Sequence, residues 1–170
     1  MSAETLKEKE AELTGMFEQY YDKIARYAYV RIGDRASAED IAGEVFLKAL
    51  KGLHSYRERG LPMSAWLFRI AHNLVVDFLR QKSKGCAVTI EEIDLPSEAN
   101  PALQAETRLE MARVEQAMKA ISPAQQEVIR LRFLSELSSK EVAAVMGKSD
   151  GAVREMQSAA ISRLKQLLVE

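Results

Sequence analysis

The stretch KEVAAVMGKSDGAVREMQ, residues 140–157, has the spacing of two short helices that cross at a tight turn. Such a unit needs a small residue where the helices touch, a glycine at the turn and an apolar residue facing inward from the second helix. Ala143, Gly147 and Val153 stand at these three positions. The stretch therefore predicts a helix-turn-helix, with an ordinary helical hairpin as the alternative on this local pattern alone.

Capping residues delimit both helices of this unit. Ser138 with Glu141 three residues on forms a capping box, and Ser149 is placed to cap the second helix. Apolar residues recur at helical spacing on the inward faces of both helices. They are Val142, Met146, Val153, Met156 and Ala160. We expect helices at about 139–146 and 150–168.

Charge is distributed unevenly along the 170 residues, although the formal net charge is only −1. Residues 1–84 hold 14 basic and 12 acidic side chains, residues 85–122 hold 3 and 7, and residues 123–170 hold 7 and 6. Because salt screens charges beyond roughly 8 to 10 Å, phosphate binding responds to local fields and not to the total charge. A near-neutral chain can therefore bind DNA, but only weakly by itself.

Composition indicates a folded cytoplasmic protein. Hydrophobic residues make up 47% of the chain, which is enough for a core, and glycine and proline are few. The polar N-terminus has no apolar signal segment, and no apolar run approaches the length of a bilayer span. The single cysteine, Cys86, cannot form an internal disulfide, which suits a reducing compartment. We expect a soluble protein without membrane insertion.

Helical periodicity predicts three helices in the first 84 residues. The first runs from Leu13 to a stop near Gly33, and the second opens with a capping box at Ser37 and Asp40. A loop at 54–63 leads to a third helix at about 64–82. The residues expected to face inward are Met16, Phe17, Tyr20, Ile24 and Ala28, then Ile41, Val45, Phe46, Ala49 and Leu53, then Trp66, Ile70, Leu74 and Phe78. Short connections predict a compact bundle.

A break in periodicity separates this bundle from a second helical block. Residues 83–101 contain two prolines, adjacent glutamates and no sustained apolar face, which indicates a linker, with a brief strand at AVTI, 87–90, as an alternative. Helical spacing resumes at about 102–121, and a further capped helix follows to about residue 134. The inward residues of the former are Leu109, Val114, Ala117 and Met118, and the capping residues of the latter are Ser122, Pro123 and Gln125. The predicted fold is all-α, with two small helical bundles (1–84 and 102–170) joined by a flexible acidic linker (85–101).

No catalytic or cofactor-binding pattern is present in the sequence. His54 and His72 lie far from any cysteine or paired-ligand spacing, so no metal site is predicted. Phosphate-binding glycine loops, the G-x-S-x-G turn and the H-E-x-x-H pair are missing. We interpret Glu91, Glu92 and Asp94 as solvated linker charge, with cation binding as the alternative. We expect a protein that is not an enzyme and needs no cofactor.

A second candidate binding surface lies on the third predicted helix and the loop before it. Cations and an amide donor share part of one helix surface there, and such groups suit a phosphate backbone. They are Arg69, His72, Asn73 and Arg80. A solvated polar face is the alternative. The loop contributes side chains that stack on or clamp an unstacked base, namely His54, Tyr56, Arg57 and Arg59.

Three segments in order carry a resemblance to a known family. They are AEDIAGEVFLKAL (38–50), AWLFRIAHNLVVDFLRQKSK (65–84) and LSSKEVAAVMGKSDGAVREMQSAAISRLKQLL (137–168). Together with their separations, they resemble the two conserved regions of bacterial extracytoplasmic-function (ECF) sigma factors, a group of the sigma-70 family. The resemblance spans about residues 13–168 and accounts for both blocks and the linker.

The resemblance implies a subunit that binds core RNA polymerase and directs promoter-specific transcription initiation, with 1–84 as region 2 and 102–170 as region 4. It implies polymerase binding by Asp40, Ile41, Glu44 and Lys48. It implies minus-10 binding by His54, Tyr56, Arg57, Arg59, Arg69, His72, Asn73 and Arg80. It implies minus-35 binding by Lys140, Ser149, Asp150, Arg154, Glu155, Gln157 and Ser158. Among these, Arg154 and Gln157 are expected to make bidentate base contacts worth roughly 1 to 3 kcal/mol each.

Further partners and alternatives follow from the same patterns. The resemblance implies an anti-sigma partner that covers the polymerase-binding and DNA-binding faces. By analogy with the family, the acidic linker would occupy the positively lined RNA path of the polymerase. The main alternative is a stand-alone helix-turn-helix regulator whose N-terminal helical bundle serves for dimerisation or sensing. Another is a helical interaction protein with no role on DNA.

Overall fold

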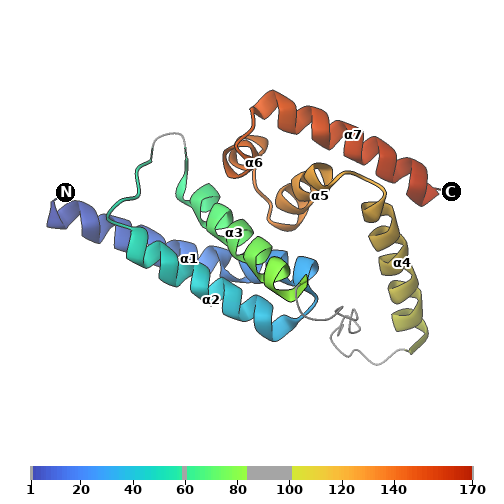
Figure 1. Cartoon of the computed structure of the whole chain (residues 1–170), viewed down its shortest axis with the longest axis horizontal. Helices are drawn as coiled ribbons and strands as arrows, with labels where there is room; N and C mark the ends of the chain where they lie inside the picture. Colours follow the sequence, from blue (N-terminus) through green and yellow to red (C-terminus); the bar gives the residue numbers. More distant parts are fainter. Residues whose placement is uncertain (1, 59–60, 84–100, 170) are drawn as a thin grey trace.

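Two blocks of helices make up the protein (Figure 1). The computed structural model describes residues 2–58, 61–83 and 101–169. The first block contains α1 (Ala3–Ile32), α2 (Arg35–Gly52) and α3 (Met63–Ser83). The second contains α4 (Pro101–Lys119), α5 (Pro123–Ile129), the π-helical segment η1 (Arg130–Leu134), α6 (Ser139–Met146) and α7 (Asp150–Val169). The predicted all-α fold is confirmed over this part of the chain.

Local signals in the sequence set most helix ends. Gly33 and Gly147 adopt the left-handed backbone conformation, at φ 75° and 65°, and end α1 and α6 as predicted. The capping boxes before α5 and α6 are both present. At the start of α7, the Ser149 hydroxyl accepts a hydrogen bond from the Ala152 amide at 3.1 Å. The helix-turn-helix therefore forms at the residues that its turn glycine and capping residues predicted.

The starts of α1 and α2 differ from the prediction. α1 begins at Ala3, well before the predicted start at Leu13, because the Ser2 side chain caps it by accepting from the Thr5 amide. α2 begins after Asp34, whose carboxylate accepts from the Ser37 amide at 3.3 Å, so the capping box predicted at Ser37 is wrong. Both corrections lengthen helices of the first block.

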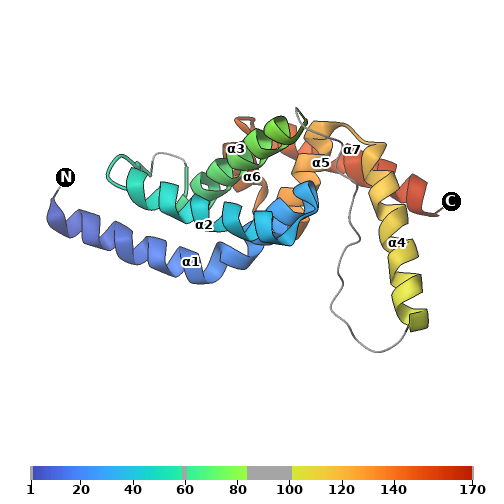
Figure 2. The same cartoon turned by 60° about the horizontal axis from the view of Figure 1, so that its bottom comes forward.

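α4 exposes apolar residues that were predicted to face inward. Leu109 is 68% exposed and Val114 is 43% exposed, whereas Ala117 is buried as predicted. Figure 2 shows the reason, because α4 projects away from the first block and packs chiefly on α7. The Arg113 guanidinium donates to the Leu168 carbonyl at this contact, at 3.1 Å. Because α4 packs chiefly on α7, one side of the helix is covered and apolar residues on its other sides stay exposed.

A continuous hydrophobic core passes through both blocks. Tyr27 and Phe68 are its largest fully buried side chains, with ring centroids 5.8 Å apart in an edge-to-face arrangement. The five inward residues predicted for α2 are buried. In α3 the fully buried stripe is Leu67, Phe68, Ala71 and Val75, and the predicted Trp66, Ile70, Leu74 and Phe78 are half-buried beside it. α3 packs on α1 and α2 and also contacts α6, so its covered face is wider than one stripe.

Phe17 in α1 is a further exception to the predicted inward pattern. Its side chain is 47% exposed, although its ring lies 5.0 Å from that of Phe46.

Among the helices of the described ranges, none is long and apolar enough to cross a bilayer.

Replacing Phe68 with alanine is expected to destabilise the protein by about 3 to 5 kcal/mol, because the lost ring leaves a cavity in the core. Urea unfolding followed by circular dichroism measures this change. Leu47→Ala is the matched control, since Leu47 is 58% exposed; it is expected to change stability by no more than about 0.5 kcal/mol. Equal losses in the two variants would contradict the placement of Phe68.

Candidate nucleic-acid interface

The first turns of α7 present most of the predicted minus-35 residues to solvent. Ser149, Arg154, Glu155 and Ser158 are exposed, and so is Lys140 on α6. Val153 is fully buried and fixes which face of α7 turns inward. Asp150 and Gln157 are half-buried at the margin of the exposed face. The helix-turn-helix thus brings the predicted set together on one surface.

Two of these side chains are held by neighbours. Arg154 Nη2 lies 3.1 Å from Asp150 Oδ2, one turn earlier in α7. Gln157 Oε1 accepts from Arg132 Nε at 2.9 Å. Because a guanidinium only donates, the amide oxygen of Gln157 must face Arg132, and its NH₂ group points away. Arg132 was missed by sequence reasoning, because it lies in η1 and its partner is 25 residues away.

A groove beside α7 extends this surface. It is lined by Arg132, Ser139, Arg154, Gln157, Ser158, Ile161, Ser162 and Lys165. Cations and hydroxyl groups predominate among these residues and no carboxylate is included, which suits phosphate oxygens. The basic groove therefore adds Arg132, Ser162 and Lys165 to the residues that the sequence indicated.

The predicted minus-10 surface on α3 is partly covered. Asn73 and Arg80 are exposed, and Arg80 lies 3.7 Å from Asp77. The Arg69 guanidinium donates to the Ala144 carbonyl of α6 at 3.1 Å. His72 faces α5, as described below. The predicted surface is thus divided between residues open to solvent and residues that contact the second block.

The loop after α2 holds Tyr56 inside the protein. Its ring stacks on Trp66 with centroids 4.7 Å apart, and its hydroxyl donates to the Leu61 carbonyl at 2.8 Å. In this conformation Tyr56 is unavailable to stack on a base, contrary to the prediction. The Arg57 guanidinium folds back onto the carbonyls of His54 and Tyr56, at 3.0 and 3.1 Å. His54 is exposed, and Arg59 lies outside the described residues.

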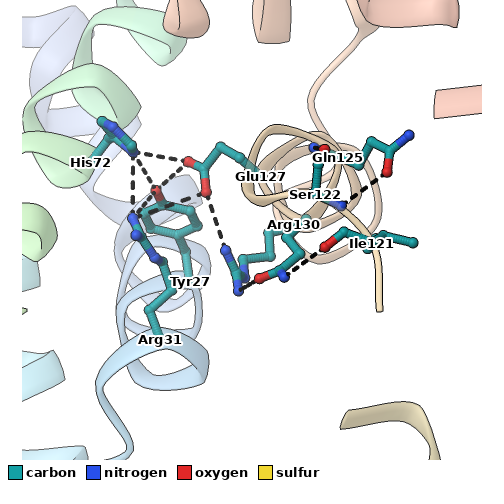
Figure 3. Close-up of polar contacts among 9 residues, drawn as sticks. Tyr27, Arg31, His72, Ile121, Ser122, Gln125, Glu127 and Arg130 are labelled. Carbon is teal, nitrogen blue, oxygen red and sulfur yellow. Dashed lines mark hydrogen bonds and ion pairs between the residues drawn. The ribbon is translucent and has the colours of Figure 1, made fainter. Parts of the chain in front are cut away.

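A buried carboxylate of the second block, Glu127 of α5, lies against the first block (Figure 3). The Tyr27 hydroxyl donates to Glu127 Oε1 at 2.5 Å, and His72 Nδ1 lies 3.1 Å from the same oxygen. Arg31 Nη1 and Arg130 Nη1 lie 4.0 and 3.6 Å from Oε2. Because an ionised carboxylate only accepts, a hydrogen bond between His72 and Glu127 requires the His72 form that has its hydrogen on Nδ1. We refer to these five residues as the Glu127 cluster.

The Glu127 cluster shifts the pKa values of three of its members, and that of Arg130 is lowered by burial and by the charge of Arg31. Burial acts to raise the pKa of Glu127, but hydrogen bonds from His72 and Tyr27 and the charge of Arg31 outweigh it and hold that pKa below its usual range. Burial is the largest cause that raises the pKa of Tyr27, and the charge and hydrogen bond of Glu127 add to it. An ionised carboxylate beside a protonated phenol is therefore the stable state.

Two further polar contacts join the blocks. Lys23 Nζ lies 2.9 Å from Glu136 Oε2, and the Ser64 hydroxyl donates to Glu141 Oε1 at 2.9 Å. The partners are 113 and 77 residues apart in the chain, so no local sequence pattern indicates them.

The outer face of α2 carries the residues predicted for polymerase binding, with one exception. Asp40, Glu44 and Lys48 are exposed, and Lys48 Nζ lies 3.9 Å from Glu44 Oε1. Ile41 is only 6% exposed and faces the core, so it does not belong to this surface. Two leucines that sequence reasoning missed are exposed on α2, Leu47 by 58% and Leu50 by 53%. The signal for them was that neither fits the inward pattern of this helix.

Metal binding finds no support in the described ranges, where no group of three or more histidine, cysteine or acidic side chains could hold an ion. The described ranges do not include Glu91, Glu92 and Asp94, the strand considered as an alternative at 87–90, or the linker to residue 100.

Comparison with known proteins identifies the family. Residues 16–85 match Sigma-70 region 2, and residues 117–166 match Sigma-70, region 4. The ECF RNA polymerase sigma factor SigD of Mycobacterium tuberculosis is 34% identical over 152 residues, which cover 86% of this chain and 72% of SigD. The chain belongs to the ECF sigma factors of the sigma-70 family. This sigma factor is also 37% identical over 155 residues to the ECF RNA polymerase sigma factor BldN of Streptomyces coelicolor, and it spans 59% of the length of BldN.

Solved structures agree with this assignment. CnrH, solved in complex with the cytosolic domain of CnrY, has a TM-score of 0.69 and 25% identity, covering 98% of this sigma factor and 93% of CnrH. RpoE of Bartonella quintana, solved with the anti-sigma factor NepR, has the same fold, with a TM-score of 0.68 and 24% identity over 92% of this chain and 96% of RpoE. The resemblance inferred from three segments is confirmed, and the helix-turn-helix lies in region 4. The protein is a sigma factor that directs promoter-specific transcription initiation, and its family is not one of enzymes.

The contact through the Glu127 cluster is expected to persist between about pH 5 and pH 10 and to weaken on both sides. Glu127 has a lowered pKa, so its contribution is present above the usual carboxyl pKa and is lost as pH falls through the lowered value. Tyr27 has a raised pKa, so its contribution is present below the usual phenol pKa and is lost as pH rises through the raised value. Small-angle scattering from below pH 5 to above pH 10 measures the expansion that follows when the blocks separate.

The control for this titration is Glu155→Gln, which removes an exposed carboxylate outside the cluster. Glu127→Gln is expected to remove the acid-side change, whereas Glu155→Gln leaves it in place. Circular dichroism at each pH ensures that the helices persist. A radius of gyration in Glu127→Gln that follows the wild-type pH profile on the acid side would contradict the role of Glu127.

Proposed function

We propose that the sigma factor holds core RNA polymerase with α2, binds the minus-10 element with α3 and the preceding loop, and reads the minus-35 element with α7. The observation that carries this proposal is the match of one chain to both region 2 and region 4. Residues 1–84 would form the first functional domain and 102–170 the second, joined by 85–101. The stand-alone regulator and the interaction protein without DNA lack such support.

The polymerase contact is proposed on the outer face of α2. Exposed leucines at 47 and 50 stand among the charged side chains of Asp40, Glu44 and Lys48. Apolar side chains ringed by charged ones are typical of protein–protein contacts, where buried anchors supply most of the binding energy. Ile41 is left out because its side chain belongs to the core.

The minus-10 contact is proposed on α3 and its preceding loop. Asn73 and Arg80 are exposed and suit the phosphate backbone. His72 is held against Glu127 of the second block, so its use on DNA requires the two blocks to separate. Arg69 is exposed, and its one bond to the Ala144 carbonyl leaves other guanidinium donors for DNA. Likewise, Tyr56 takes part only if it leaves Trp66. The remaining proposed contacts are His54, Arg57 and Arg59.

The minus-35 contact is proposed on the helix-turn-helix. α7 is the helix that would enter the major groove, as in other helix-turn-helix proteins. The proposed contacts are Lys140, Ser149, Arg154, Glu155, Gln157 and Ser158, with Asp150 considered below. The basic groove, through Arg132, Ser162 and Lys165, supplies cations and hydroxyls for the adjoining phosphates.

Two further proposals concern the setting of this function. An anti-sigma factor would restrain the protein, and the likeness to CnrH, solved with the cytosolic domain of CnrY, supports such a partner. The place of action would be the cytoplasm, where bacterial polymerase and promoter DNA are found. The acidic segment 85–101 would enter the RNA path of the polymerase, supported by its carboxylates and by the family alone.

Purified protein is expected to co-elute with sigma-free bacterial core polymerase in gel filtration, and the complex is expected to give discrete transcripts from sheared genomic DNA. The double variant Leu47→Ser, Leu50→Ser is expected to weaken co-elution at least about tenfold, which corresponds to about 1.4 kcal/mol. Leu109→Ser is the matched control, because Leu109 is an exposed leucine on α4, outside the proposed surface.

Failure to co-elute at both low and moderate salt would reject the polymerase contact. The stand-alone regulator would then be favoured, and sedimentation with DNA would show a dimer on paired half-sites. Equal losses of co-elution in the double leucine variant and in Leu109→Ser would not contradict polymerase binding by the wild type. They would reject the placement of the contact on α2.

A further inference from the structure

Asp150 opens α7 with a carboxylate that is turned toward its own helix. Oδ2 lies 3.1 Å from Arg154 Nη2. Oδ1 is buried and makes no hydrogen bond within the part of the chain that the structure describes. The carboxylate therefore faces Arg154 on one side and the protein on the other, and it is poorly placed to reach a base.

Arg154 has the opposite character. Its side chain is 67% exposed, against 31% for Asp150, and it stands on the first turns of the proposed reading helix. Its guanidinium is a planar fork with five N–H donors, so one contact to Asp150 leaves donors for another partner. The guanine edge in the major groove offers N7 and O6 as a pair of acceptors that matches such a fork.

The pairing restrains a long side chain before DNA arrives. Asp at position i and Arg at i+4 face each other on one helix surface, with the acid on the favourable N-terminal side. An ion pair as exposed as this one is weak in water, but it strengthens when a docked duplex excludes water. A guanidinium that is already oriented loses less conformational freedom on binding.

Asp150 would otherwise oppose DNA binding. A carboxylate near the DNA-facing end of α7 is repelled by phosphates. Glu155 is a second acid on the same helix, but it is exposed and forms no ion pair with a described residue. The two acids therefore place similar charge near DNA, and only Asp150 contacts the proposed base reader.

We propose that Asp150 does not contact DNA but is a positioning residue, which holds the guanidinium of Arg154 for bidentate reading of one guanine in the upstream promoter element. The inference rests on the proposed function of α7 and deepens it. It replaces the expectation that Asp150 itself binds the element. It also names the base that the pair selects.

The experiment uses the full chain with core polymerase. Transcription from sheared genomic DNA first yields one promoter, whose upstream element is then randomised at every position. Transcripts sequenced from this library give the preference for each base at each position. The proteins compared are wild type, Arg154→Ala, Asp150→Ala and the control Glu110→Ala, which removes an exposed carboxylate of α4 outside the proposed DNA surfaces, each checked for helix content by circular dichroism.

The wild type is expected to prefer guanine at one position by about tenfold or more. Arg154→Ala is expected to lose that preference. Asp150→Ala is expected to reduce it to about a third of the wild-type ratio or less, without lowering output from elements that lack this guanine. Glu110→Ala is expected to keep the preference, because it removes a charge away from the DNA surface and leaves the pair in place.

An unchanged guanine preference in Asp150→Ala would overturn the inference. A loss shared equally by all elements would also overturn it, because a purely structural role of Asp150 at the start of α7 gives that result. Arg154→Ala without any change in base preference would remove the reader on which the pair depends. A wild-type chain that yields no promoter-specific transcript in the first step would reject the proposed function itself, and the inference with it.

Discussion

The buried carboxylate of Glu127 constrains this structure more than any other group. A charge removed from water is costly unless partners surround it, and breaking such a set leaves an uncompensated charge in the interior. Glu127 is 5% exposed, and its partners come from α1, α3 and η1. One side chain of the second block therefore fixes the positions of three side chains of the first.

The same group determines which surfaces are open. His72 turns toward Glu127, and the neighbouring Arg69 reaches the backbone of α6. With His72 as a proposed minus-10 contact, the bond of this side chain to Glu127 and its contact with DNA exclude each other. The exposed start of α7 is under no such restriction. A ligand shifts the equilibrium between joined and separated blocks only if it binds the separated form more tightly. Polymerase and promoter DNA would have to bind in this way to separate the blocks.

Sequence patterns predicted what depends on neighbours in the chain. The turns at Gly33 and Gly147 and the boxes before α5 and α6 rest on contacts within a few residues, and they were correct. Asp34 was missed because Ser37 offered a competing pattern only three residues on. The exposure of Leu109 was missed because helical spacing tells which residues share a face but not whether a neighbour covers it.

The candidate site shows the same limit more sharply. The chemical types on α7 and α3 were readable, since cations and amides on a helix surface suit nucleic acid wherever the helix lies. The positions of His72, Tyr56 and Gln157 were not, because each is set by a partner that spacing cannot indicate: Glu127, Trp66 and Arg132. The sequence indicates the exposed Leu47 and Leu50 of α2 only because neither residue fits the inward pattern of this helix.

The π-helical segment gives the second block its internal geometry. The Ser135 amide bonds to the Arg130 carbonyl five residues back, at 3.1 Å, so η1 holds one residue more in its turn than an α-helix would. Arg130, at the end of α5, faces Glu127 one turn earlier, while Arg132, inside η1, faces Gln157 of α7. The length of this segment, and not only its composition, is therefore under constraint. A deletion of one residue after Arg130 would turn Arg132 away from Gln157, whereas conservative substitutions would not.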